Sequence, residues 1–196
     1  MPQDKYTFAY TFTAQAEGGF SDVAEDKGGV TAYGVCIELL KSMSQTPIDR
    51  AFLQSAGVSL PITRVSVTGL SKDQAKKIFK YEFWDKHALD KYPLKMAALL
   101  FDMGVNHGWR NAVKLAQRGY NANLGPYGSK LVVDGIDGLK TKAALQQDSI
   151  KLLNKILDAR AAFFRAIVEN HPSQQKFLKG WLNRVGALRL YLQREV

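Results

Sequence analysis

The segment MAALLFDMGV, residues Met96–Val105, is nearly all apolar. A helix that is apolar on every side must be buried, so we expect this segment to form the central helix of the fold. Pro93, just ahead of it, suits the first turn of a helix. The segment predicts a mainly α protein whose other helices pack around it.

Apolar residues recur at helical spacing on both sides of this segment. They predict helices over residues 5–17, 35–43, 49–56, 110–120, 149–169 and 173–193, and helices that start at Ser71 and near Thr141. Ser71 and Gln74 form a capping box. Residues 57–70, GVSLPITRVSVTGL, are β-branched without a helical stripe, which predicts a loop or a short strand. Residues 121–138 are turn-rich and form the only plausible internal boundary.

The composition is that of a basic globular protein. It has 27 Lys and Arg against 18 Asp and Glu, for a net charge of +9. This charge favours anionic partners such as nucleic acid, a membrane surface or a bacterial wall polymer, or it is simply solvated. Cys36 is the single cysteine, so we expect no internal disulfide and a small buried side chain. We find neither a secretory signal nor an apolar span long enough for a membrane, and expect synthesis in the cytoplasm without a signal peptide.

The stretch EGGFSDVAEDKGGVTAYG, residues 17–34, holds the residues that suggest chemistry. Hydrolysis of a glycosidic bond needs an acid that stays protonated near neutral pH, so its pKa must be raised. Glu17 is expected in the last turn of the first helix, where the negative end of the helix dipole disfavours a carboxylate. On the helical pattern alone, a surface glutamate before a glycine cap is the favoured interpretation of Glu17.

The loop after Glu17 supplies two alternative second carboxylates, Asp22 and Asp26, and both also fit turn chemistry. Thr31 and Tyr33 lie in VTAYG, where alternation suits a short strand or hairpin. The Thr31 hydroxyl would hold the attacking water. Alternatively, the threonine is present only because β-branched residues favour strands.

The spacing of Glu17, Asp26 and Thr31 is similar to the Glu–Asp–Thr spacing of phage lysozymes. The stretch more specifically resembles glycoside hydrolase family 108, whose motif reads Glu-Gly-Gly, then Asp-x-Gly-Gly-x-Thr-x-x-Gly. The resemblance covers nearly the whole chain and continues in FWDKHALDKYP, LLFDMGVNHG, DGIDGLKT and FLKGWLNRV. Leu139 departs from the family, which usually has proline there.

The resemblance implies a lysozyme-like, mainly α fold with a small β element after the catalytic glutamate. The activity it implies is cleavage of the bond between N-acetylmuramic acid and N-acetylglucosamine in peptidoglycan, without a cofactor. Glu17 then maps onto the general acid, and Asp26 with Thr31 onto the base or water-holding pair. Asp22 and Tyr33 are expected to contact substrate.

Four residues near the end of the central helix are further candidates for substrate contact. The indole of Trp109 suits a sugar face, and Asn106 suits an acetamido group. His107 lies between them in the sequence, and Asp102 lies one helical turn before Asn106. The alternative is a helix end packed on the core.

Other readings of the sequence are weaker. Asp134 and Asp137 lack the oxygen ligands of a calcium loop, so we expect a structural turn, and the histidines show no metal-ligand spacing. Arg184, Arg189 and Arg194 on the last helix are expected to attract anionic wall material or to be solvated. We expect no nucleic-acid partner, because no groove-reading element is present.

The expected protein is an endolysin-type muramidase of phage or prophage origin, in a family with some members labelled secretion activators. We expect a monomer with one compact domain, 1–196, whose region 1–92 is catalytic and whose region 93–196 resembles a peptidoglycan-binding domain. It would act on glycan strands of the wall, in the periplasm, without stable membrane insertion, after release through a holin or another export route. The rival is a non-catalytic wall-binding or secretion-assisting protein.

Overall fold

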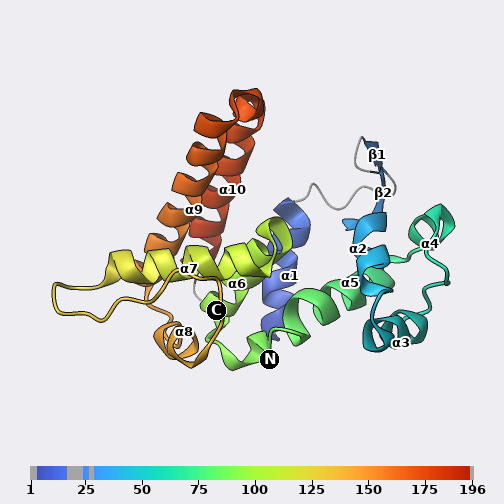
Figure 1. The fold of residues 1–196 in the computed structure, drawn as a ribbon, viewed down its shortest axis with the longest axis horizontal. Helices are drawn as coiled ribbons and strands as arrows, with labels where there is room; N and C mark the ends of the chain where they lie inside the picture. Colours follow the sequence, from blue (N-terminus) through green and yellow to red (C-terminus); the bar gives the residue numbers. More distant parts are fainter. Residues whose placement is uncertain (1–3, 17–23, 27–28, 195–196) are drawn as a thin grey trace. The chain divides into compact units, whose positions relative to one another are not determined.

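The computed structural model describes residues 4–16, 24–26 and 29–194 (Figure 1). The chain forms two compact units, Met1–Phe12 with Ala88–Val196, and Thr13–His87. Helix α1 (Lys5–Ala16) contributes residues to both. The mainly α fold expected from the sequence is confirmed. The expected single domain with regions 1–92 and 93–196 stays a prediction.

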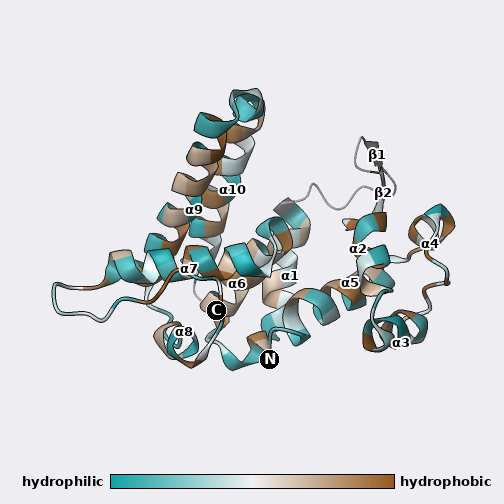
Figure 2. Cartoon of the chain, viewed as in Figure 1, coloured by the Kyte–Doolittle hydropathy of each residue, from teal (hydrophilic) through white to brown (hydrophobic). Residues whose placement is uncertain are grey.

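The larger unit is helical. After the first part of α1 it contains η2 (Leu89–Lys91), α6 (Leu94–His107), α7 (Trp109–Asn123), α8 (Leu139–Ala144), α9 (Ile150–Asn170), η3 (Pro172–Gln174) and α10 (Gln175–Leu192). Helices α9 and α10 run side by side as a hairpin, and α7 packs against α9 (Figure 1). Both hairpin helices carry hydrophilic and hydrophobic faces (Figure 2), as amphipathic helices must when they share a core.

Helix α6 is the centre of the larger unit. Every residue from Met96 to Gly104 is buried, as the apolar run predicts. Pro93 immediately precedes the helix and is its N-terminal cap residue. From the N-terminal helix, Tyr6 meets Phe101 of α6 edge to face with ring centres 5.7 Å apart. Tyr191 of α10 donates its hydroxyl hydrogen to the Phe8 carbonyl over 2.9 Å.

The crossing of α7 and α9 depends on Gly119. A Cβ at this position would lie 2.4 Å from the Cα of Ile156, which is closer than van der Waals contact allows. The missing side chain therefore lets the backbones of α7 and α9 approach closely at Gly119 and Ile156.

The smaller unit combines a sheet with short helices. It contains β1 (Ala24–Asp26), β2 (Gly29–Ala32), β3 (Val35–Cys36), α2 (Ile37–Met43), α3 (Pro47–Ser55), α4 (Arg64–Thr68), α5 (Lys72–Lys80) and the π-helix η1 (Tyr81–Asp85). The strands pair antiparallel in the order β1-β2-β3. Val30 and Ala32 of β2 and Val35 of β3 are buried. Cys36, expected to be buried, is only half-buried.

The expected loop or strand over residues 57–70 is confirmed as a loop for residues 57–63, and helix α4 corrects it for Arg64–Thr68. The Ser66 hydroxyl accepts a hydrogen bond from the Thr63 N–H over 3.0 Å, which caps the start of the helix. Val67 is buried beneath it while Val65 is exposed. The β-branched residues therefore occupy one short helical turn, because a cap and a single buried contact outweigh their strand propensity.

Candidate functional site

The β1-β2 hairpin carries part of the predicted catalytic set. Asp26 pairs with Gly29, and Thr31 pairs with Ala24 on one side and Cys36 on the other. Thr31 is half-buried, and its strand neighbours Val30 and Ala32 turn into the core of the smaller unit. Thr31 therefore lies on the opposite face of the sheet from that core, because successive side chains of a strand alternate. Glu17 and Asp22 lie outside the described residues.

Tyr33 occupies a strained turn between β2 and β3. Its φ is 50° and that of Gly34 is 80°, and Ala32 pairs with Val35 across this two-residue loop. Positive φ at both central residues matches a type I′ hairpin turn, which normally takes Asn-Gly or Gly-Gly. A tyrosine in the left-handed region costs about 1–2 kcal/mol. The Lys72 ammonium lies 5.8 Å from the centre of its ring.

We expect Tyr33→Asn to leave the free energy of unfolding within about 1 kcal/mol of the wild type, because relief of backbone strain offsets the lost cation–π contact. The substrate KM is expected to rise about three- to tenfold if the ring stacks on a sugar. Urea denaturation and hydrolysis kinetics measure the two effects. A large loss of stability with an unchanged KM would instead assign the ring to the fold.

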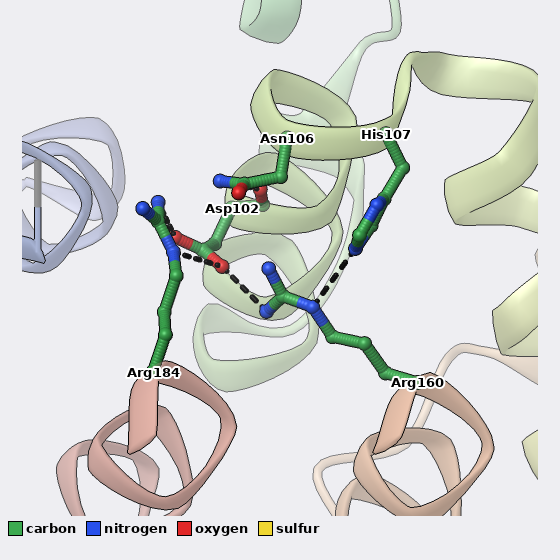
Figure 3. A network of polar contacts seen from close by, with 5 residues as sticks. All are labelled: Asp102, Asn106, His107, Arg160 and Arg184. Atoms are coloured by element: carbon green, nitrogen blue, oxygen red, sulfur yellow. Dashed lines mark hydrogen bonds and ion pairs between the residues drawn. The ribbon is translucent and has the colours of Figure 1, made fainter. Parts of the chain in front are cut away.

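The second candidate region lies at the C-terminal end of α6 and is organised by Asp102 (Figure 3). This carboxylate is fully buried. Arg160 of α9 donates to Oδ2 over 2.6 Å, and Arg184 of α10 donates to Oδ1 over 2.6 Å. Burial raises the pKa of Asp102, but the two guanidinium groups outweigh burial and hold the pKa below its usual value. Asp102 thus stays ionised and ties three helices together.

The burial of Asp102 argues against the substrate contact expected for this residue. Both carboxylate oxygens are taken by arginines, and the side chain exposes no surface. The expectation that Asp102 touches substrate therefore has no geometric support in this structure. Asp102 is linked to His107, which follows it on α6, through their shared partner Arg160.

His107 extends the network from Asp102. Arg160 donates its Nε hydrogen to His107 Nε2 over 3.0 Å, so that ring nitrogen must be unprotonated. Burial, followed by the charge of Arg160, lowers the pKa of His107 to about 4. The imidazole ring also packs edge to face against Phe163, with ring centres 5.5 Å apart, and against Phe164, with ring centres 5.1 Å apart. His107 is thus a neutral acceptor held in one orientation.

The His107 pKa gives a testable pH dependence. Because the unfolded-state pKa of about 6.5 exceeds the folded one, the unfolded chain binds more protons below pH 6.5 and stability falls as pH falls. We expect the wild type to lose about 1–2 kcal/mol more than His107→Gln between pH 7 and pH 5. Urea denaturation at both pH values measures this. Equal losses in the two proteins would contradict a neutral, buried His107.

Asn106 and Trp109 flank His107 at the break between α6 and α7. Asn106 is exposed, and its Nδ2 donates to the Asp102 carbonyl over 3.3 Å. Trp109 is half-buried, and its ring packs against Gly104, where an added Cβ would lie 3.6 Å from the ring. Gly108 links the helices with φ 74° and ψ 153°, a conformation open essentially only to glycine. Contact of Asn106, His107 and Trp109 with substrate stays a prediction.

The loop of residues 134–138 is a structural turn, as expected. Asp134 Oδ1 accepts from the Ile136 N–H and from Gln117 Nε2, each over 2.8 Å. Tyr92 donates its hydroxyl hydrogen to Asp137 over 2.6 Å. Leu139 begins α8, and its side chain is exposed, so a residue other than proline fits that first turn.

The basic residues of α10 do not form the free surface that we expected. Arg184 is bonded to the buried Asp102, and Arg189 pairs with Asp158 over 2.7 Å. The expectation is therefore wrong for Arg184, whereas Arg189 stays partly exposed in its ion pair at the surface. The guanidinium of Arg194 lies 5.0 Å from the Tyr191 ring centre. Sequence reasoning missed the role of Arg160, because a lone arginine on a long amphipathic helix carries no signal of its buried partner.

Within residues 4–16, 24–26 and 29–194, no group of three or more His, Cys, Asp or Glu side chains is placed to hold a metal ion. Across the same part of the chain, no helix has both the length and the hydropathy to cross a membrane.

Comparison with known proteins adds two family matches and one similar structure. Residues 10–108 match the protein-family model described as Glycosyl hydrolase 108. Residues 111–186 match the family model described as Predicted Peptidoglycan domain. The chain is similar to the structure of Brucella abortus SagA, with a TM-score of 0.69 and 24% sequence identity over 95% of this chain and 92% of that one. At that identity the likeness shows the fold. The comparison with curated proteins gave no match.

Proposed function

Because the chain belongs to the glycosyl hydrolase 108 family, we propose that it hydrolyses the β-1,4 bond between N-acetylmuramic acid and N-acetylglucosamine in peptidoglycan. The family match supports a glycosidase, and the peptidoglycan-domain match over residues 111–186 supports peptidoglycan as its substrate. The observation that carries the proposal is the match over residues 10–108, which contains the whole Glu-Gly-Gly to Asp-x-Gly-Gly-x-Thr motif.

In the proposed mechanism Glu17 is the general acid. It protonates the glycosidic oxygen as the bond to the leaving sugar breaks, and positive charge develops on the other sugar ring. Water then adds to that ring with help from Asp26 and Thr31. The backbone register of the hairpin supports this pairing, because Asp26–Gly29 and Ala24–Thr31 are ladder pairs that bring the two residues onto adjacent strands. Asp22 remains the alternative second carboxylate.

Substrate contacts are proposed for Tyr33, Asn106, His107 and Trp109. Tyr33 is held in a strained turn, which surrounding structure must maintain and which is common at functional sites. The exposed Asn106 suits hydrogen bonding to an acetamido group, and the half-buried Trp109 suits stacking on a sugar. His107 would act as an oriented neutral group.

The biological setting is proposed from the family resemblance. The protein would act on the wall in the periplasm as a phage or prophage endolysin, released by a holin or another route, and would be a monomer. Infection or induction with the holin gene deleted tests the route: intact cells that still contain active enzyme would support release by a holin, and lysis would support another route.

The proposed chemistry is tested with purified sacculi and the full chain. We expect new reducing ends to appear with time, and the wild type to bind sacculi as well. Binding without new reducing ends would replace the proposal by the non-catalytic wall-binding protein. Release of peptides alone, without reducing sugar, would assign the chain to another class of hydrolase.

A further inference from the structure

A groove of about 340 Å³ lies in the larger unit, between the end of α7 and the start of α8. Its floor is Gln117 and Thr141, both buried, and its rim is formed by residues 130–140. It lies entirely within the part of the chain that matches the peptidoglycan domain. None of the groups assigned to catalysis or sugar contact lines it.

Two amide side chains of α7, one turn apart, hold the rim in place. Asn121 accepts from the Leu131 N–H and donates to the Leu131 carbonyl, each over 2.8 Å. Gln117 accepts from the Gly135 N–H over 3.0 Å and donates to Asp134 Oδ1 over 2.8 Å. Gly135 has φ 79°, and a Cβ there would lie 2.7 Å from the Arg110 carbonyl oxygen. The groove is therefore fixed before any ligand arrives, which lowers the entropy cost of binding.

The side chains of the rim do not follow the usual distribution, in which apolar groups are buried and polar groups are exposed. Two carboxylates of the rim turn inward, where Asp134 bonds to Gln117 and Asp137 bonds to the buried Tyr92. Large aliphatic groups turn outward, and Val132, Ile136 and Leu139 are 75%, 64% and 88% exposed. A loop that only covered the core would bury these aliphatic groups. Apolar side chains gathered at the edge of a groove are typical of a binding surface.

The charges of the groove narrow the choice of ligand. Lys130 and Lys140 are exposed on its rim, and neither forms an ion pair with a described residue. Asp134 lines the same groove, and its hydrogen bond from the Ile136 N–H, with that from Gln117, lowers its pKa, so it is an anion. The groove thus offers two cations, one anion and aliphatic contacts, and none of its lining residues is an aromatic platform for a sugar.

We propose that this groove binds the stem peptide of peptidoglycan, an inference that rests on peptidoglycan being the substrate. The stem peptide carries free carboxylates, which Lys130 and Lys140 would bind, and an amino group on its third residue, which suits Asp134. Its alanine methyl groups match Val132 and Leu139. Bound in this way, the peptide would hold the polymer while the other unit acts on the glycan.

The test is an NMR or calorimetric titration of the full chain with synthetic stem tetrapeptides, carrying diaminopimelate or lysine at the third position. We expect one of them to bind, and a Lys130→Ala/Lys140→Ala variant to bind about tenfold more weakly. Leu139→Ser is expected to weaken binding as well. Lys151→Ala, which removes an exposed lysine of α9 outside the groove, is the matched control and should bind as the wild type does.

Failure of both peptides to bind, or equal binding by the groove variant and the control, would overturn the inference. Wild-type cleavage of sacculi in the same preparation keeps the two proposals apart. Cleavage without peptide binding leaves the muramidase standing and removes the groove proposal. Peptide binding without cleavage supports the groove and removes the muramidase.

Discussion

Glu17→Gln is expected to lower the rate of peptidoglycan hydrolysis by about 10³-fold while the protein stays folded. General acid catalysis contributes about 10²–10⁴-fold, and an amide cannot donate a proton to the leaving oxygen. The change keeps the size of the side chain and removes only its acid function. Reducing-end release under saturating sacculi measures the rate, and circular dichroism with thermal melting measures the fold.

Glu38→Gln is the matched control. Glu38 is an exposed residue in the first turn of α2, in the smaller unit, and it belongs to none of the predicted sites. The same chemical change there is expected to leave the rate within about twofold of the wild type, far less than loss of a general acid. Near-wild-type activity in Glu17→Gln would remove Glu17 from the mechanism and return attention to Asp22 and Asp26.

Asp102→Asn is expected to destabilise the protein by about 3–5 kcal/mol, because it leaves buried arginine charge without its counter-ion. Arg160 is fully buried and Arg184 nearly so, and both bond to this one carboxylate. Urea denaturation at neutral pH measures the effect. Asp158→Asn removes a carboxylate from an ion pair that is 58% exposed at Asp158, and is expected to cost less than about 1 kcal/mol.

The same carboxylate predicts a response to acid. The folded-state pKa of Asp102 lies below the usual value, so its contribution to stability is present above the unfolded pKa and is lost as pH falls through the folded pKa. The difference in unfolding free energy between wild type and Asp102→Asn should therefore shrink below about pH 4. A difference that is small at neutral pH, or independent of acid, would contradict the role of the network.

The sequence predicted those parts of the fold whose cause is local. The apolar run Met96–Val105 predicted the buried α6, and Ser71 with Gln74 predicted the start of α5, which the structure caps with that pair. The glycine-rich stretch predicted a hairpin, found as β1 and β2. Within residues 57–70 the prediction of a loop or strand was wrong only for Arg64–Thr68, because strand propensity there is weaker than the Thr63–Ser66 cap.

The polar network could not be predicted, because its partners are far apart in the sequence. Asp102 bonds to residues 58 and 82 positions away, on two helices whose periodicity shows only an apolar face. The same limit explains why Arg184 looked solvated and Asp102 looked available to substrate. The groove on α7 was hidden for a similar reason, since Gln117 and Asn121 read as ordinary polar positions.

The central claim is tested most directly by the identity of the new reducing end. Sacculi are digested with the wild type, the products are reduced with borohydride, and their termini are identified by mass spectrometry. We predict N-acetylmuramitol at the new ends. N-acetylglucosaminitol would show cleavage of the other glycosidic bond and contradict the proposed activity, and the absence of any new reduced sugar would contradict glycan hydrolysis altogether.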